Sequence, residues 1–224
     1  MIVLGFDTAT AATAVALLDS EAPGNATERR HDPAPGVRPG HGSLLLGLAH
    51  ELLHCAGLKF ADVDRIAVGV GPGGFTGLRI GVSTARALAQ AADAEIVGVS
   101  TLHALAMAAE PQPGRNVLAV VDARRGEVFA AGWREGERVL GPLAVAPAAV
   151  GELGVEGWLA VGDGALRFRD DLDAAGLVVP PDHSAQHGVS ARMICRIALG
   201  VECGTDPKIV VPDYLRKPDA KPRP

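Results

Sequence analysis

A buried strand, a glycine-rich loop, a long helix and a second buried strand follow one another between residues 66 and 99. Ile66–Val70 and Glu95–Val99 are short, almost continuously apolar runs, which are typical of parallel strands covered on both faces. A helix is expected between them over Thr76–Ala92. Because parallel strands joined through a helix need a sheet with helices on its faces, the sequence predicts an α/β fold.

The residues before this unit extend the same architecture. Two strand-like runs, Ile2–Phe6 and Thr13–Leu18, flank a turn of small residues and predict an antiparallel hairpin, and a weaker third strand is expected over Thr27–His31. A Leu-rich helix is expected over Ser43–Ala56, with Gly57 at its end. Residues 1–110 are therefore expected to form one lobe built on a mixed sheet.

The second half repeats this pattern of elements without repeating the sequence. Strands are expected over Val117–Val121, Glu127–Trp133, Arg138–Leu140 and Trp158–Val161, with helices over Pro147–Leu153 and Ser190–Leu199. The Pro- and Gly-containing stretch 111–114 is the expected boundary. The second lobe is thus expected over residues 111–212, followed by a basic, Pro-containing tail over residues 213–224, with residues 216–224 expected to be disordered.

Charge and composition exclude several classes of function. The formal net charge is −5 and aromatic residues make up 4% of the chain, so neither a global attraction to nucleic acid or anionic membranes nor a base-stacking platform is expected. Any contact with nucleic acid has to be local or made through a partner. The apolar runs are shorter than the roughly 20 residues that span a bilayer, and residues 1–7 are expected to be a strand and not a signal peptide. Three dispersed cysteines without a CxxC motif favour the reducing cytoplasm.

One short motif points to metal chemistry. His50-Glu51-Leu52-Leu53-His54 matches HExxH, in which two histidines on one helix face can bind zinc while the glutamate activates a water molecule. The longer metzincin pattern would place its third ligand at Phe60, which has no lone pair to offer. A polar stripe on an amphipathic helix explains the motif more simply, and a zinc peptidase stays the alternative.

The loop before the second helix reads GPGGFTGLRIG over residues 71–81. It lies where phosphate loops occur, but Leu78 stands where a P-loop has lysine, and the Rossmann spacing fits poorly. Small residues recur here every four positions and form a helix ridge with almost no side chain, along which another backbone can approach closely. The ridge consists of Gly73, Gly77, Gly81, Ala85 and Ala89. What approaches is either the chain's own sheet or a neighbouring helix.

The preceding helix has more apolar residues than one sheet-facing stripe requires. Leu44, Leu45 and Leu46 are consecutive, which distributes them over more than one face at 100° per residue. A second apolar stripe suggests a partner helix. Two neighbouring helices with surplus apolar surface predict an interaction surface in preference to a catalytic pocket.

Five segments spread over nearly the whole chain carry a family resemblance. They are IVLGFDTAT (residues 2–10), HGS (41–43), GPGGFTGLRIG (71–81), VDARRGEVF (121–129) and PDYLR (212–216). Together they resemble the bacterial TsaB family, and the segment over residues 71–81 is the most specific of them.

The resemblance implies a two-lobed fold similar to the actin/Hsp70/sugar-kinase (ASKHA) superfamily, each lobe a mixed sheet flanked by helices. It implies a non-catalytic paralogue of TsaD that pairs with TsaD, joined by the ATPase TsaE, for N6-threonylcarbamoylation of adenosine 37 in tRNAs that read ANN codons. It also implies a homodimer in isolation, tRNA contact only through the complex, and no cofactor of its own, with ATP or ADP bound at the complex. A stand-alone ASKHA-type ATPase is a second alternative.

The resemblance makes the two helices the pairing elements. The residues expected at the contact are His41, Leu45, Leu48, Leu52, Phe75, Thr76, Gly77, Leu78, Arg79, Gly81 and Ala85. No catalytic or metal-binding residue is expected. The phosphate turns and nucleoside loop of the superfamily would fall at Asp7, Asp122, Gly162 and Asp163. Ala9 replaces the glycine of the first Asp-x-Gly turn, however, and ordinary turns explain the other positions more simply.

Overall fold

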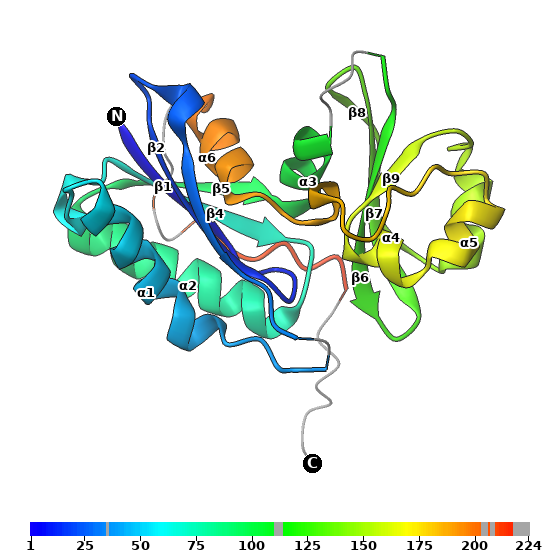
Figure 1. Cartoon of the computed structure of the whole chain (residues 1–224), viewed down its shortest axis with the longest axis horizontal. Helices are drawn as coiled ribbons and strands as arrows, with labels where there is room; N and C mark the ends of the chain where they lie inside the picture. The colour runs from blue at the N-terminus through cyan, green and yellow to red at the C-terminus, as the bar shows by residue number, and fades with distance from the viewer. Residues whose placement is uncertain (35, 110–113, 203–205, 207–208, 217–224) are drawn as a thin grey trace.

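The computed structural model describes residues 1–34, 36–109, 114–202, 206 and 209–216. Two sheets stand next to each other, with helices between them and on their outer faces (Figure 1). Among the described residues, no helix combines the length and the apolar character needed to cross a membrane.

The first sheet has the strand order β3-β2-β1-β4-β5. Its strands are β1 (Ile2–Asp7), β2 (Thr13–Asp19), β3 (Thr27–His31), β4 (Arg65–Gly71) and β5 (Glu95–Ser100). The first three strands pair antiparallel, whereas β1, β4 and β5 run parallel. The mixed sheet that the sequence predicts for this lobe is therefore confirmed.

Helices cover both faces of this sheet. Helices α1 (His41–Cys55) and α2 (Phe75–Ala92) lie on one face, and α3 (Thr101–Ala109) and α6 (Ala191–Leu199) lie on the other (Figure 1). Gly57, with φ of 70°, follows the end of α1 as expected, because glycine adopts this left-handed conformation without strain.

The second sheet has the order β8-β7-β6-β9, with β6 and β9 parallel and the other pairs antiparallel. Its strands are β6 (Val117–Arg124), β7 (Glu127–Arg134), β8 (Glu137–Val145) and β9 (Leu159–Val161). Its outer side is covered by η3 (Pro147–Leu153) and the short helices α4 (Asp163–Arg167) and α5 (Arg169–Ala174). The remaining 3-10 turns are η1 (Pro23–Asn25), η2 (Phe60–Asp62) and η4 (Ala185–His187).

Helix α3 was not predicted from the sequence, although it lies at the centre of the molecule. It packs between the two sheets, and one apolar cluster includes side chains of both sheets together with α3 and α6. Six of its nine residues are buried, so apolar residues surround the helix axis and leave no amphipathic period to detect. Helices α4 and α5 were also missed, because five and six residues are too few for a period to appear.

The C-terminal elements pack on the first sheet, although the sequence places them in the second lobe and the tail. Helix α6 was assigned to the second lobe, but it packs on β1 and β2 of the first sheet. Gly5 makes this possible, because a Cβ atom there would lie 2.5 Å from Sγ of Cys195. Further on, Val210 is buried in the first-lobe core and the Asp213 amide donates to the Val70 carbonyl at 2.7 Å. Of the predicted tail, residues 213–216 pack on the protein and residues 217–224 lie outside the described residues.

Candidate functional site

Helices α1 and α2 lie side by side on the first sheet and share one exposed side (Figure 1). On α1, Leu45 and Leu52 face the sheet and are 2% and 3% exposed, whereas Leu46 is 50% exposed. The 100° turn between neighbouring helical residues separates Leu45 from Leu46 in this way. Leu46 therefore adds apolar surface to the exposed side of α1, whereas Leu45, one of the expected contact residues, faces the sheet.

The small-residue ridge of α2 packs against the chain's own turn between β1 and β2. A Cβ atom on Gly77 would lie 1.9 Å from the Thr8 carbonyl oxygen, and one on Gly81 would lie 2.4 Å from Thr8 Oγ1. Thr8 Oγ1 also donates to the Gly77 carbonyl at 2.8 Å. Of the two possibilities left open by the sequence, close contact with the protein itself is the correct one for this ridge.

Seven of the expected contact residues consequently face the protein's own interior, which corrects the predicted interface. The buried seven are His41, Leu45, Leu52, Gly77, Leu78, Gly81 and Ala85. Leu48 is half-buried, while Phe75, Thr76 and Arg79 are exposed. The structure adds Leu46, and partly buried Ile80 of α2, to the surface that a partner can reach.

The start of α2 carries an exposed aromatic cluster that includes the C-terminal segment. The rings of Phe75 and Tyr214 lie 5.1 Å apart, and the Arg79 guanidinium lies 3.9 Å from the Phe75 ring centroid. Arg79 Nε donates to the Tyr214 hydroxyl at 3.1 Å. No pattern in the sequence predicts this contact, because Tyr214 is 135 residues away from Arg79 in the chain.

His41 begins α1 as a structural residue. It is 5% exposed, and its Nδ1 is hydrogen-bonded to Oγ1 of Thr13 at 2.8 Å. Burial lowers the pKa of His41, so the neutral imidazole is favoured. His41 therefore fixes the start of α1 against β2 and does not offer a charge to a partner.

Asp7 lies at the end of β1 and is 1% exposed. Its carboxylate accepts hydrogen bonds from the Ala9 amide and from the Thr101 hydroxyl, both at 2.8 Å. Burial raises the pKa of Asp7, although the two hydrogen bonds act in the opposite direction. Gly69 makes room for this carboxylate, since a Cβ atom there would lie 1.8 Å from Asp7 Oδ2.

Asp122 and Asp163 come together in the second lobe. Asp163 Oδ1 accepts the Asp122 amide at 3.0 Å, and burial raises the pKa of Asp163. The Asp122 side chain is 5% exposed, and its Oδ2 accepts from Arg124 Nη1 at 3.0 Å and from Arg167 Nη1 at 2.9 Å. Gly162 precedes Asp163 with φ of 119°, which a residue with a side chain rarely adopts.

A cavity of about 450 Å³ separates the Thr8–Thr10 turn from Asp122 and Asp163. Its residues do not fit a magnesium–nucleotide complex. The donors that could reach a phosphate already donate within the chain. The Ala9 amide donates to Asp7 Oδ1 at 2.8 Å, the Gly74 amide to the Ala9 carbonyl at 2.7 Å and the Thr8 hydroxyl to the Gly77 carbonyl at 2.8 Å. Both arginine contacts to Asp122 neutralise the carboxylate that a metal ion would need. The start of α2 and two arginines thus take up the groups that bind phosphate and metal in a phosphate turn.

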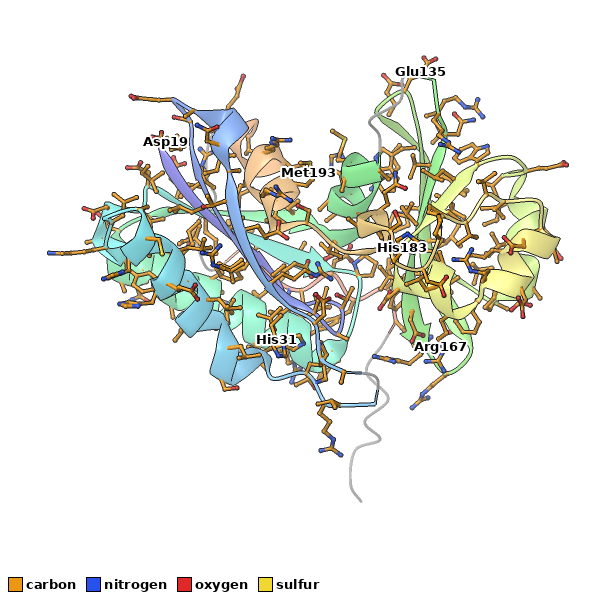
Figure 2. All side chains as sticks on the ribbon, viewed as in Figure 1. Asp19, His31, Glu135, Arg167, His183 and Met193 are labelled. Carbon is orange, nitrogen blue, oxygen red and sulfur yellow. The ribbon has the colours of Figure 1, made fainter. Side chains whose placement is uncertain are left out.

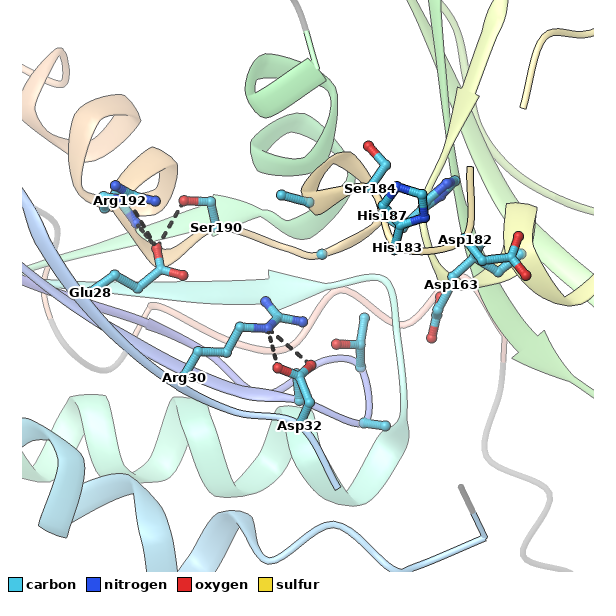
Figure 3. A pocket seen from close by; sticks show the side chains of 16 residues that line it. Glu28, Arg30, Asp32, Asp163, Asp182, His183, Ser184, His187, Ser190 and Arg192 are labelled. Atoms are coloured by element: carbon cyan, nitrogen blue, oxygen red, sulfur yellow. Dashed lines mark hydrogen bonds and ion pairs between the residues drawn. The ribbon is translucent and has the colours of Figure 1, made fainter. Parts of the chain in front are cut away.

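A larger cavity of about 570 Å³ opens between the lobes (Figure 3). Its charged side chains are paired with groups of the chain itself. Glu28 accepts from the Ser190 hydroxyl at 2.9 Å and lies 3.5 Å from Arg192 Nε, and Arg30 donates to Asp32 at 2.7 Å (Figure 3). These pairs hold β3 near the start of α6 and leave a cleft whose ionic groups satisfy one another.

The HExxH residues form a stripe on the exposed side of α1. The His50 and His54 rings stack with centroids 6.1 Å apart, while Glu51 Oε1 accepts from Arg29 Nε at 3.0 Å. Phe60 lies beside both histidines in a shallow pocket and supplies no ligand. Within the part of the chain that the structure describes, no group of three or more metal-binding side chains occurs.

Comparison with known proteins places this geometry in context. The family model described as "TsaD: tRNA N6-adenosine threonylcarbamoyltransferase" matches residues 25–165, more than half of the chain. An uncharacterized protein of Mycobacterium tuberculosis is 32% identical over 231 residues, which cover 98% of this chain and 94% of that protein. The Escherichia coli tRNA threonylcarbamoyladenosine biosynthesis protein TsaB is 35% identical over 140 residues, or 62% of this chain and 56% of that protein.

Solved structures agree with these matches. YeaZ from Pseudomonas aeruginosa superposes with a TM-score of 0.72 at 28% identity, covering 96% of this chain and 99% of that one. A ROK hexokinase from Thermus thermophilus superposes with a TM-score of 0.52 at 12% identity, covering 89% of this chain and 100% of that one. The second likeness concerns the fold alone, and it confirms the predicted ASKHA-type architecture.

Proposed function

The chain belongs to the TsaD family as one of its TsaB members, and from that premise we propose that it is a non-catalytic docking subunit that pairs with TsaD in tRNA threonylcarbamoyladenosine biosynthesis. A role in that biosynthesis follows from the family. The division of labour is the proposed part: TsaD carries the chemistry, and this chain supplies a surface that TsaD needs.

The observation that carries the proposal is the exposed side of α1 and α2, which we call the α1–α2 face. It presents Leu46, 50% exposed, beside Gly42, Ser43 and Gly47, which are exposed and small. A helix of a partner can approach such a surface closely and cover the leucine. A half-exposed apolar side chain on the outer side of a helix is typical of helix–helix association.

The interior of the molecule supports the non-catalytic part of the proposal. Asp7 is enclosed, the Thr8–Ala9 turn is occupied by α2, and Asp122 is paired with two arginines. The acidic groups at these described turns are thus enclosed or paired within the chain, as a docking subunit allows. We further propose that TsaE joins the pair, that ATP or ADP binds at the assembled complex, and that the chain alone forms a homodimer through the same face.

A reconstituted modification reaction tests the proposal. TsaD and TsaE of the same organism, ATP, the threonylcarbamoyl-adenylate donor and a tRNA reading ANN codons are combined with the wild-type chain or a variant. Leu46→Asp should reduce modification at least tenfold, because it places a charge in the apolar contact. Val139→Asp is the matched control, since Val139 is 53% exposed on β8, far from α1. Full modification with Leu46→Asp, or without the chain, would refute the docking role.

A further inference from the structure

Four arginines gather at the edge where the second lobe meets the start of α1. Arg38 and Arg124 line the cavity of about 450 Å³ described above. Arg125 follows Arg124 at the tip of the β6–β7 hairpin, and Arg167 shares the Asp122 carboxylate with Arg124. All four side chains are exposed. We call this group the arginine rim, and Figure 2 shows Arg167 at the lower edge of the second lobe.

Asp122 prepares two of these arginines to bind an anion. Its side chain is 5% exposed, whereas those of Arg124 and Arg167 are 63% and 53% exposed, so the carboxylate is inside and both guanidinium groups reach solvent. A guanidinium has five N–H donors, and Asp122 accepts one from each arginine. Asp122 therefore orients both guanidinium groups, and the three side chains together keep a net positive charge. Asp122 uses only one N–H donor of each guanidinium. Planar guanidinium groups held in this way match the oxygens of phosphate.

The hairpin tip carries its arginines against its local backbone preference. Arg124 and Arg125 have φ of 64° and 56°, and Gly126 follows with φ of 77°. This left-handed conformation favours glycine or asparagine at a tight hairpin turn, and a long side chain there lowers stability. Turn formation does not explain two consecutive arginines at these positions. An asparagine–glycine turn would form the hairpin more readily but would carry no positive charge.

The rim is a local exception to an acidic molecule. The chain has a formal net charge of −5, and α5 beyond α4 carries Asp170, Asp171 and Asp173 on the outer side of the second lobe (Figure 1). Directly after the hairpin tip, Glu127 pairs with Arg216, so these two charges neutralise each other and Arg216 adds no unpaired positive charge to the rim. A polyanion can therefore contact positive charge on this side of the molecule along the arginine rim.

From these observations we propose that the arginine rim binds the phosphate backbone of RNA. The inference rests on the proposed function in one respect, since the RNA presented to this chain in the complex is then the tRNA substrate. Arginines spread along an edge suit successive phosphates better than a single acidic side chain of a protein partner. The chain thus contacts tRNA itself, in addition to holding TsaD.

Binding of fluorescently labelled tRNA to the complex of this chain with TsaD tests the rim. The anisotropy titration is repeated between about 50 and about 200 mM salt, the range over which phosphate contacts change affinity strongly. The test variant is Arg38→Gln with Arg125→Gln, which leaves the Asp122 contacts in place. The matched control is Arg134→Gln with Arg138→Gln, which flank Glu135 at the opposite end of the lobe from Arg167 (Figure 2).

The test variant should weaken tRNA binding at least about tenfold near 0.1 M salt, and the slope of log K against log salt should fall by about 2, or 1 per phosphate contact. The control should match the wild type. An unchanged slope and affinity in the test variant would overturn the proposal. So would a loss of TsaD pairing with unchanged tRNA affinity, because the rim would then bind protein.

Light scattering on each mixture separates this inference from the proposed function. A wild-type complex that forms but binds no tRNA overturns the rim alone. If the chain does not pair with TsaD, the proposed function fails. The anisotropy titration is then made with the chain alone and the same tRNA at about 50 mM salt. Binding that the test variant lacks and the control keeps would then support the rim, and equal affinity of all three proteins would overturn it.

Discussion

At the scale of single residues, two kinds of position that look alike in the sequence have opposite surroundings. Gly77 and Gly47 both lie inside helices, where glycine is less favourable than alanine. A Cβ atom on Gly77 would lie 1.9 Å from a backbone oxygen of Thr8, whereas one on Gly47 would meet nothing within 4 Å. The fold thus requires glycine at position 77 but not at position 47.

Gly77→Ala should therefore lower the free energy of unfolding by about 1–3 kcal/mol, because the backbone has to move to admit the methyl group. Gly47→Ala should raise it by about 0.5–1 kcal/mol, because alanine loses less conformational entropy in a helix. Urea denaturation measures both. Equal effects of the two substitutions would mean that α2 does not pack closely on the Thr8 turn.

Asp7 gives a second prediction at this scale, with a defined dependence on pH. Its pKa is raised by burial above the ordinary value of 3.8, so between the two values the folded state binds more protons than the unfolded state. Stability is therefore lost as pH rises from 3.8 through the raised pKa. Asp7→Asn removes this loss and can still accept from the Ala9 amide. The Tm of the variant minus that of the wild type should be more positive at neutral pH than near pH 3.8. A difference that shrinks with rising pH would contradict the assignment.

At the scale of elements, Leu45 and Leu46 show what the sequence can and cannot resolve. Three consecutive leucines on one helix cannot all face the sheet, so the existence of an exposed apolar residue on α1 was predictable. Which leucine is exposed depends on the rotation of α1 about its axis. That rotation is fixed by contacts from distant residues, such as Thr13 on His41.

Leu45→Ala should lower the free energy of unfolding by about 2–5 kcal/mol, since it leaves a cavity in the core. Leu46→Ala should change it by no more than about 0.5 kcal/mol, because the side chain is largely exposed. Chemical denaturation of the two variants, measured on the chain without partner at low concentration, compares neighbouring positions directly. A large loss with Leu46→Ala would show that α1 is rotated differently.

The difference between local patterns and contacts of distant residues also explains which other elements can be predicted from the sequence. The strand–loop–helix–strand unit over residues 66–99 and the antiparallel hairpin were predictable because their patterns are local. The sequence does not predict helix α3 because nearly all of its residues are apolar and leave no amphipathic period. It does not predict the packing of α6 on β1 and β2, because these strands are far away in the chain. The pairing of Tyr214 with Phe75 and the sharing of Asp122 by two arginines depend on tertiary structure in the same way.

At the scale of the whole molecule, the two lobes share part of their core. Helix α3 packs against both sheets, and buried residues of β1, β4 and β5 belong to the same apolar cluster as residues of β6, β7 and β9. The segment over residues 210–216 adds contacts from the first-lobe core to Glu127 of the second sheet. Neither lobe can therefore lose its structure without exposing apolar surface of the other.

The chain should accordingly unfold in one cooperative transition. Differential scanning calorimetry should give a ratio of calorimetric to van't Hoff enthalpy of about 1. Two resolved transitions, or a ratio well above 1, would mean that the lobes unfold independently and that the shared cluster around α3 contributes little. The calorimetry is made on dilute protein, because association through the α1–α2 face would make the Tm depend on protein concentration.

Docking of TsaD on the α1–α2 face is measured by size-exclusion chromatography with light scattering. The chain is measured alone and mixed with TsaD of the same organism, as wild type, Leu46→Asp and the control Val139→Asp. If TsaD docks on this face, the wild type and the control form a stoichiometric complex, and Leu46→Asp gives separate peaks with its Tm unchanged. A complex of the same mass with folded Leu46→Asp, or no complex with the wild type, would contradict it.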